Sequence, residues 1–172
     1  MRREPEGRWI LFDAVGTLMV PDPPVAVAYR AAARRFGSRL DEAAIGARFR
    51  AAFQAHAYTG GATNEQAERA RWRAVVGQVI DDVRGVKAEA LFESLWGHFA
   101  RPEHWRLFDD VPAALERLTR RGWRLAIASN FDARLRTVVG GHPPLAACEP
   151  LFISSEIGFA KPDRRFFAAI EA

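Results

Sequence analysis

The stretch from Trp9 to Leu18, WILFDAVGTL, decides the fold of this chain. Four apolar residues come first, Asp13 follows them, and Gly16-Thr17 provides a turn. A continuous apolar run that ends at a turn signal is typical of a strand buried on both faces of a parallel sheet. In open α/β sheets the reacting groups lie just beyond the carboxyl ends of the strands, which is where Asp13 falls. Asp13 is therefore a candidate reactive carboxylate, and the alternative is that it only caps a turn.

Two later stretches repeat this arrangement of an apolar run followed by a polar side chain. Residues 123–130 read WRLAIASN, and their apolar run ends at Ser129 and Asn130. Residues 151–162 read LFISSEIGFAKP, and the loop after the apolar run carries Lys161. Because the carboxyl ends of parallel strands meet at one edge of a sheet, we expect Asp13, Ser129 and Lys161 to converge around one anion-sized space.

The region between the first two motifs has a helical pattern throughout. Residues 20–104 contain four stretches with apolar positions at helical spacing and no strand pattern, which predicts a small bundle. The first helix is predicted to be capped by Asp22 and to end at Gly37, the second starts at Asp41, the third at Asn64, and the fourth follows Gly85.

The remainder of the chain alternates between helix and strand. A helix is predicted at 111–122, a strand at 123–128, a helix from 131 to 139, a strand at 151–153 and a last helix from Pro162. Short strands that alternate with helices favour an α/β fold with a doubly wound, parallel, Rossmann-like sheet. We therefore predict a core of residues 1–19 and 105–172 into which the helical bundle, residues 20–104, is inserted.

Composition and charge favour an ordinary globular protein that acts on small anions. The 172 residues are 49% hydrophobic and 27% charged, and the net charge of +4 is scattered over many arginines. Scattered charge argues against a nucleic-acid partner and suits a small anionic substrate. No apolar run approaches the ~20 residues that cross a bilayer, so no membrane contact is expected. The single cysteine, Cys148, is predicted to be a buried small apolar residue, which suits a reducing, cytoplasmic location.

Candidate polar residues of the helical block have a weaker pattern. His56, His98 and His104 have no metal-ligand spacing, which favours core or surface histidines. Arg30 and Arg34, together with His56, are candidate substrate contacts, although a solvated helix face explains them better.

The motif order, Asp13, then Ser129, then Lys161-Pro162, resembles that of the haloacid dehalogenase-like (HAD) hydrolase superfamily. DAVGTL is similar to the first motif of that superfamily, ASN to the second and KPD to the third. The length of the chain and the sequences of its motifs resemble subfamily I, which has a helical cap between the first two motifs. Within subfamily I they resemble a branch whose first motif starts with DAVGTL. The resemblance runs from Trp9 to the end of the chain.

The resemblance implies a catalytic role for three residues. Asp13 would be the nucleophile, which forms a covalent aspartyl intermediate that water then cleaves. Ser129 would donate a hydrogen bond to a substrate oxygen. Lys161 would neutralise charge on both Asp13 and the substrate.

Binding roles follow from the same resemblance. Gly16, Thr17 and Asn130 would bind the substrate or hold the loop around it. A Mg²⁺ ion would be bound by the carboxylate of Asp13 and the backbone carbonyl of Val15.

Val15 is the first departure from the family pattern and leaves two activities open. In the phosphatases of the superfamily this position is a second aspartate, the general acid for the leaving alkoxide. The loss of a positioned general acid typically costs ~10²–10⁴ in rate, whereas a halide leaves without a proton. The chain is therefore interpreted as a hydrolase of a small phosphorylated metabolite, which SNFDARL and WRLFDDV favour, or as a 2-haloacid dehalogenase.

The second departure lies at the end of the sequence. The fourth family motif, an acidic pair after a further strand, has no counterpart before Ala172. We expect a truncated chain whose WILF strand is an unpaired sheet edge, open to self-association. A third hypothesis follows, a catalytically silent fragment or binding protein.

Overall fold

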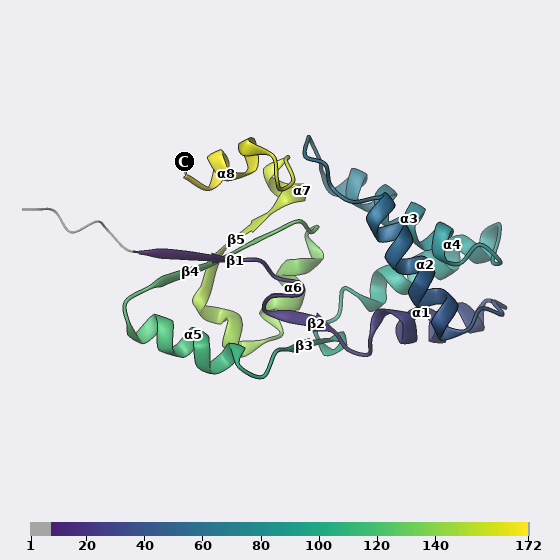
Figure 1. The fold of residues 1–172 in the computed structure, drawn as a ribbon, viewed down its shortest axis with the longest axis horizontal. Coiled ribbons are helices and arrows are strands. Elements are labelled where there is room, and N and C mark those ends of the chain that lie inside the picture. The colour runs from purple at the N-terminus through teal and green to yellow at the C-terminus, as the bar shows by residue number, and fades with distance from the viewer. Residues whose placement is uncertain (1–7, 172) are drawn as a thin grey trace, which may run out of the picture.

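The computed structural model describes residues 8–171 of the chain, which form a sheet with flanking helices and a separate helical bundle (Figure 1). The strands are β1 (Trp9–Phe12), β2 (Met19–Pro21), β3 (Trp105–Leu107), β4 (Arg124–Ser129) and β5 (Cys148–Ile153). The helices are α1 (Val25–Arg35), α2 (Glu42–Ala55), α3 (Glu65–Val79), α4 (Val86–His98), α5 (Val111–Arg120), α6 (Arg134–Gly140), α7 (Ser154–Ile157) and α8 (Arg164–Glu171).

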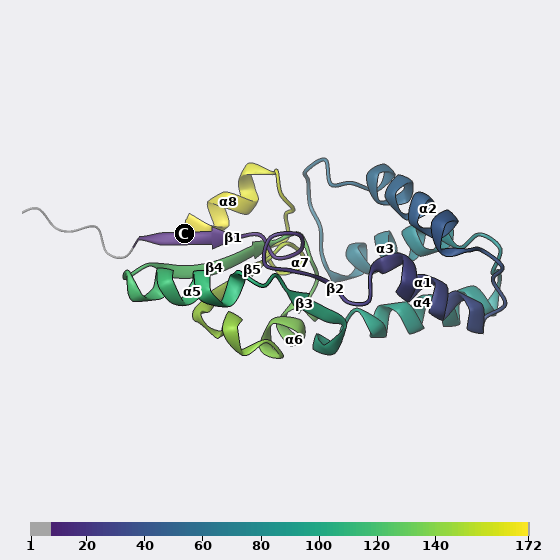
Figure 2. The same ribbon diagram turned by 60° about the horizontal axis from the view of Figure 1, so that its bottom comes forward.

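Three parallel strands form the sheet in the order β1-β4-β5. The ends of β4 and β5 are level, because Ser129 pairs with Ile153, and β1 ends slightly before them, because Phe12 pairs with Ile127. Helices α5 and α6 lie on one side of this sheet and α8 lies on the other (Figures 1 and 2). β4 is buried from Leu125 onward, as a strand covered on both faces should be. This arrangement confirms the predicted α/β fold with a parallel sheet.

β1 is an edge strand of the described sheet. The predicted burial of this strand on both faces is wrong, because Trp9 and Leu11 remain 37% and 42% exposed at the edge. The guanidinium of Arg124 lies 4.1 Å from the centre of the Trp9 ring. Self-association through this edge remains a prediction.

The helical bundle consists of α1 to α4, in which α1 and α3 each pack against both α2 and α4. Two predicted caps are confirmed: the carboxylate of Asp41 accepts a hydrogen bond from Ala44 N and the amide oxygen of Asn64 accepts one from Ala67 N, each at 2.8 Å. Within residues 8–171, no helix combines the length and the apolarity that a membrane crossing requires.

A two-stranded antiparallel ribbon, β2 with β3, joins the bundle to the sheet region. The predicted cap of the first helix by Asp22 is wrong, because α1 begins at Val25 after Pro24 and the Asp22 N–H bonds instead to the carbonyl of His104 at 2.8 Å. Strands of three residues are too short to produce a periodic pattern, so the sequence indicated only a loop here. The predicted domain boundaries, 19/20 and 104/105, fall at this ribbon.

Other differences from the predicted elements are small. β5 starts at Cys148 instead of residue 151, α7 was not predicted, and α8 starts at Arg164 instead of Pro162. Cys148 is fully buried and free, as predicted, and burial raises the pKa of its thiol to about 11.

Candidate active site

Asp13, Ser129 and Lys161 line one cavity of about 540 Å³ between the strand ends and the helical bundle. Asp13 follows β1 directly, Ser129 is the last residue of β4, and Lys161 lies in the loop between α7 and α8. The side chains come together because β1, β4 and β5 run parallel and end at the same edge of the sheet.

The ammonium group of Lys161 joins two of these strand ends. Its Nζ donates one hydrogen bond to Oδ1 of Asp13 and another to the carbonyl of Ala128, each at 2.7 Å. The side chains of Lys161 and Asp13 are 24% and 44% exposed, so solvent and ligands can reach the pair. A cation fixed beside a half-exposed carboxylate is suited to holding an anion against that carboxylate.

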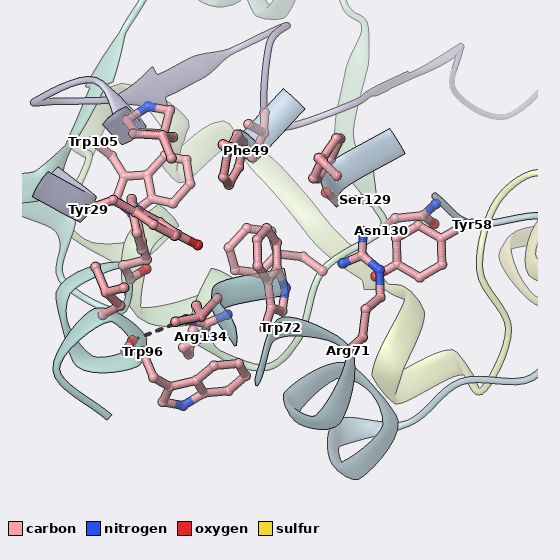
Figure 3. A pocket seen from close by; sticks show the side chains of 18 of the residues that line it. Tyr29, Phe49, Tyr58, Arg71, Trp72, Trp96, Trp105, Ser129, Asn130 and Arg134 are labelled. Atoms are coloured by element: carbon pink, nitrogen blue, oxygen red, sulfur yellow. Dashed lines mark hydrogen bonds between the residues drawn. The ribbon is translucent and has the colours of Figure 1, made fainter. Parts of the chain in front are cut away.

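Asn130 lines the cavity and also holds the main chain of Lys161. Its amide nitrogen donates to the Lys161 carbonyl at 2.9 Å, and its amide oxygen accepts from the Lys161 N–H at 2.7 Å. Ser129, at 2% exposure, lies in the wall beside it (Figure 3). Asn130 therefore acts on the position of the lysine as well as on the cavity surface.

The loop after Asp13 turns sharply at Gly16, whose φ is +87°. Main-chain hydrogen bonds close the loop, from Gly16 N to Met19 O at 2.8 Å and from Leu18 N to Ala14 O at 2.9 Å. Thr17 is exposed, and within residues 8–171 its hydroxyl makes no hydrogen bond to protein. Val15 lines the cavity, whereas Gly16 and Thr17 do not.

Two arginines that the sequence analysis did not single out, Arg134 and Arg71, also line the cavity. Arg134 forms two hydrogen bonds of 2.7 Å with the fully buried carboxylate of Asp132, and its guanidinium lies 3.4 Å from the ring centre of Trp96. Arg71 donates to the carbonyl of His56 at 2.8 Å, while its Nη2 is buried without a hydrogen-bond partner. Figure 3 shows the Arg71 side chain directed toward Ser129 and Asn130.

The candidate contacts proposed from the bundle lie elsewhere. Arg30, Arg34 and His56 are not part of the cavity wall, and His56 pairs instead with Gln78 at 3.2 Å. No sequence signal distinguishes Arg71 from Arg30 and Arg34, since all three lie in polar positions of helices.

The wall that the bundle contributes is mainly aromatic. Ten of the 21 lining residues are aromatic, and Tyr29, Phe49, Trp72 and Trp96 come one from each helix of the bundle. The Tyr29 hydroxyl points into the cavity (Figure 3), and burial raises the pKa of this phenol well above its usual value, so the group stays protonated. Trp72 has the helical spacing of an apolar position, which does not distinguish a helix–helix contact from a cavity wall.

Residues 61–65 attach the bundle to the loops around the site. Gly61 and Thr63 form main-chain hydrogen bonds with Ala160 and Gly158, at 3.2 and 2.9 Å. The Glu65 carboxylate accepts from the Ala133 N–H at 2.9 Å and also from the Ser155 hydroxyl. This segment, residues 61–65, is called the latch below.

Two protein groups at the site are suitable ligands for Mg²⁺, but they do not complete its coordination shell. A carboxylate and a main-chain carbonyl, those of Asp13 and Val15, are the hard oxygen ligands that Mg²⁺ prefers. Within residues 8–171, no group of three or more His, Cys, Asp and Glu side chains is placed to hold a metal. Waters and substrate oxygens would have to complete the coordination of an ion bound here.

Comparison with known proteins identifies the family. The family model described as "Hydrolase: haloacid dehalogenase-like hydrolase" matches residues 8–172. The chain belongs to the haloacid dehalogenase-like hydrolase family. It is 31% identical over 166 residues to human haloacid dehalogenase-like hydrolase domain-containing protein 3, and 30% identical to the Bos taurus protein of the same name. In both cases 93% of this chain is covered, and the chain spans 66% of the length of these relatives.

Solved structures share the fold. A dehalogenase with an intermediate complex superposes with a TM-score of 0.63 at 18% identity, covering 96% of this chain and 71% of the other. A proposed HAD-hydrolase from Bacillus subtilis, YfnB, bound to magnesium, gives a TM-score of 0.64 at 17% identity, covering 95% and 71%. At these identities the similarity extends to the fold alone.

Proposed function

We propose that this hydrolase cleaves small phosphorylated metabolites through a covalent aspartyl intermediate at Asp13. One observation carries the proposal: Nζ of Lys161 lies 2.7 Å from Oδ1 of Asp13 on the wall of a cavity that Ser129 also lines. A carboxylate, an ammonium and a hydroxyl at one end of a cavity are the groups that transfer of a phosphoryl dianion requires.

The reaction proceeds in two displacements at phosphorus. An oxygen of Asp13 attacks phosphorus and forms an acyl-phosphate, while the bond from phosphorus to the ester oxygen breaks. The organic group leaves as an oxyanion with the electron pair and takes a proton from solvent. Water then attacks the phosphoryl group, which releases inorganic phosphate and restores the carboxylate. Lys161 offsets the negative charge of the two reacting anions, and the hydroxyl of Ser129 donates to a phosphoryl oxygen.

Mg²⁺ is part of this proposal. When bound, the ion would supply charge neutralisation and orientation of the substrate. The Asp13 carboxylate and the Val15 carbonyl would hold it, with waters in the remaining positions.

The bundle is proposed to act as a cap over the site, in the subfamily I manner. Residues 1–19 and 105–172 then form the catalytic core and residues 20–104 form the cap. The aromatic wall and the latch support this division, because both bring bundle residues next to the strand ends.

Replacement of Asp13 by Asn tests the proposal. Asn has nearly the same shape but is a far weaker nucleophile, so phosphate release in the presence of Mg²⁺ should fall by about 10⁴-fold. The measurement is phosphate release from a panel of phosphate monoesters, with Asp22→Asn as a control because Asp22 lies outside the cavity wall. Activity that survives Asp13→Asn undiminished would remove Asp13 from the mechanism.

Val15 supports a second candidate function, hydrolysis of short 2-haloacids. This aliphatic side chain lines the cavity next to Asp13, at the place where the phosphatases of the family carry their general acid. Halide needs no proton to leave, so Asp13 alone would suffice for the displacement at carbon. Halide release from a 2-haloacid tests this candidate, and a protein that releases neither phosphate nor halide would be a binding protein instead.

A further inference from the structure

We infer that the substrate is a phosphate monoester of an aromatic alcohol, with its ring against the aromatic wall of the cavity and its phosphoryl group at Asp13 and Lys161. This inference rests on the proposed function and names its substrate class. Two independent observations carry it: the composition of the bundle-side wall, and the lack of a suitable proton donor among the lining residues.

The cavity is built to receive a flat apolar group. Rings of the bundle contact each other along the wall, with centre-to-centre distances of 5.4 Å for Tyr29–Phe49, 5.8 Å for Phe49–Phe53 and 6.1 Å for Phe53–Trp72. Aromatic rings bind one another through offset or edge contacts at such distances, so a ring entering this space would extend a series already present.

A hydroxyl-rich organic group, such as that of a sugar phosphate, would lose its hydrogen bonds in this cavity. Apart from the tryptophans, eight of the 21 lining residues carry polar side-chain atoms, and six of those already form hydrogen bonds with protein groups, namely Asp13, Tyr58, Arg71, Asn130, Arg134 and Lys161. Each buried hydroxyl without a partner is costly. The wall therefore discriminates against polar alcohols.

The leaving group provides the second argument. Among the described residues, Asp13 is the one carboxylate that lines the cavity and no histidine lines it, while Val15 stands two positions after the nucleophile. The two phenols, Tyr29 and Tyr58, have pKa values raised by burial, and the Tyr58 hydroxyl donates to Glu68, so neither is a good acid at neutral pH.

Without a general acid, the ester oxygen must leave as an anion. A phenol has a pKa of about 10, whereas water, close in acidity to an aliphatic alcohol, has a pKa of about 15.7. When Asp13 attacks phosphorus, the bond from phosphorus to the aryl oxygen breaks, the aryloxide carries away the electron pair, and it takes a proton from solvent afterwards. An aromatic alcohol thus fits the aromatic wall and can also leave without a general acid.

Three substrates separate the two arguments: naphthyl phosphate, naphthylmethyl phosphate and glycerol phosphate. The first two share the ring, and the last two share an alkoxide leaving group. We expect kcat/KM to fall in this order, with similar KM for the two naphthyl esters and a kcat for naphthylmethyl phosphate lower by about 10²-fold. In Val15→Asp, which returns an acid to this position, the ratio of the two kcat values should narrow.

A binding measurement decides the inference even when no ester is cleaved. The affinity of naphthylphosphonate, which is not hydrolysed, is compared with that of methylphosphonate through the fluorescence of the lining tryptophans. We expect naphthylphosphonate to bind at least about tenfold more tightly. Trp72→Ala should reduce this preference, whereas Val86→Ala, a bundle residue that is 88% exposed and outside the wall, should retain it. The wild-type preference is decisive if Trp72→Ala does not fold.

Failure of the inference and failure of the proposed function give different results. Equal binding of the two phosphonates, or glycerol phosphate turnover as efficient as that of naphthyl phosphate, overturns the inference while hydrolysis stands. Preferential binding of naphthylphosphonate with no phosphate released from any ester upholds the ring site and overturns the proposed hydrolysis.

Discussion

The two walls of the cavity are built on different principles. On the sheet side, the polar groups are tied to main chain: Lys161 Nζ donates to the Ala128 carbonyl and Asn130 clasps the backbone of Lys161. On the bundle side, rings from successive helices contact one another, and side-chain packing alone holds Phe49 and Phe53 in place. Hydrogen bonds to the main chain at the strand ends fix the positions of the polar groups, whereas packed rings can be exchanged for other apolar groups.

This difference teaches where chemistry and selectivity are expected to reside. Changes on the sheet side should act on the rate of the chemical step, and changes on the bundle side should act on the binding and choice of the organic group. A sheet-side variant that changes only binding, or a bundle-side variant that changes only the rate of the chemical step, would contradict this distinction.

Among the variants that test the distinction between the two walls, replacement of Lys161 by Met should have the largest effect. Met retains much of the apolar length of lysine but removes the cation that contacts Asp13 at 2.7 Å, so kcat for phosphate release should fall by about 10²–10³-fold. Steady-state kinetics on naphthyl phosphate measures this change. Lys87→Met is the matched control, because Lys87 is exposed on α4 and is the only other lysine of the chain. A rise in KM at unchanged kcat would assign Lys161 to binding instead.

The latch offers a way to weaken the contact between the two walls without touching either. Glu65→Ala removes the carboxylate that accepts from the Ala133 N–H and from the Ser155 hydroxyl. The free energy of unfolding should fall by about 1 kcal/mol, the usual net contribution of a hydrogen bond of this kind. Urea denaturation measures the loss, and hydrogen exchange at the Ala133 amide should accelerate.

Gln66→Ala is the control for the latch, since Gln66 is exposed in the same helical turn. An equal loss of stability in both variants would attribute the effect to the helix end and not to the latch.

Much of the sheet side could be predicted from the sequence, and the reason is geometric. A run such as LAIA followed by Ser129 specifies a buried parallel strand with a polar group at its carboxyl end, and parallel strands bring such ends together. The approach of Asp13 to Ser129 follows from that rule, whereas Lys161 reaches Asp13 from the loop between α7 and α8. The ribbon at residues 19–21 was missed because three residues carry no period.

The bundle side could not be predicted in the same way. An apolar residue such as Trp72 has the same helical spacing whether it packs against a neighbouring helix or faces a cavity. Arg71 was missed for a related reason, because the sequence does not indicate that one of its nitrogens would be buried without a partner. Asn130 was expected to bind substrate, and its contact with the Lys161 backbone depends on a loop that sequence patterns do not describe.

The smallest expected effect is a dependence of stability on pH, and it arises where the bundle meets the ribbon, at His98 and His104. His98, at the end of α4, stacks on His104 with ring centres 3.6 Å apart, and its Nε2 is buried without a partner. Burial first, and then the neighbouring His104 and Arg101, lower the pKa of His98 below its ordinary 6.5, while Glu103 opposes the shift. As the pH falls through 6.5, the unfolded chain takes up a proton that the folded chain resists, so the free energy of unfolding decreases until the lower folded pKa is passed.

His98→Phe removes this titration and keeps an aromatic ring in the stack. Urea denaturation of the wild type and the variant, repeated from pH 8 to about pH 5, should therefore give a stability difference that shifts in favour of the variant below about pH 6.5. A difference that stays constant over this range would mean that His98 takes up its proton equally well in the folded and unfolded chains. In that event the stacked histidines contribute only packing between the bundle and the ribbon, and not a stability that depends on pH.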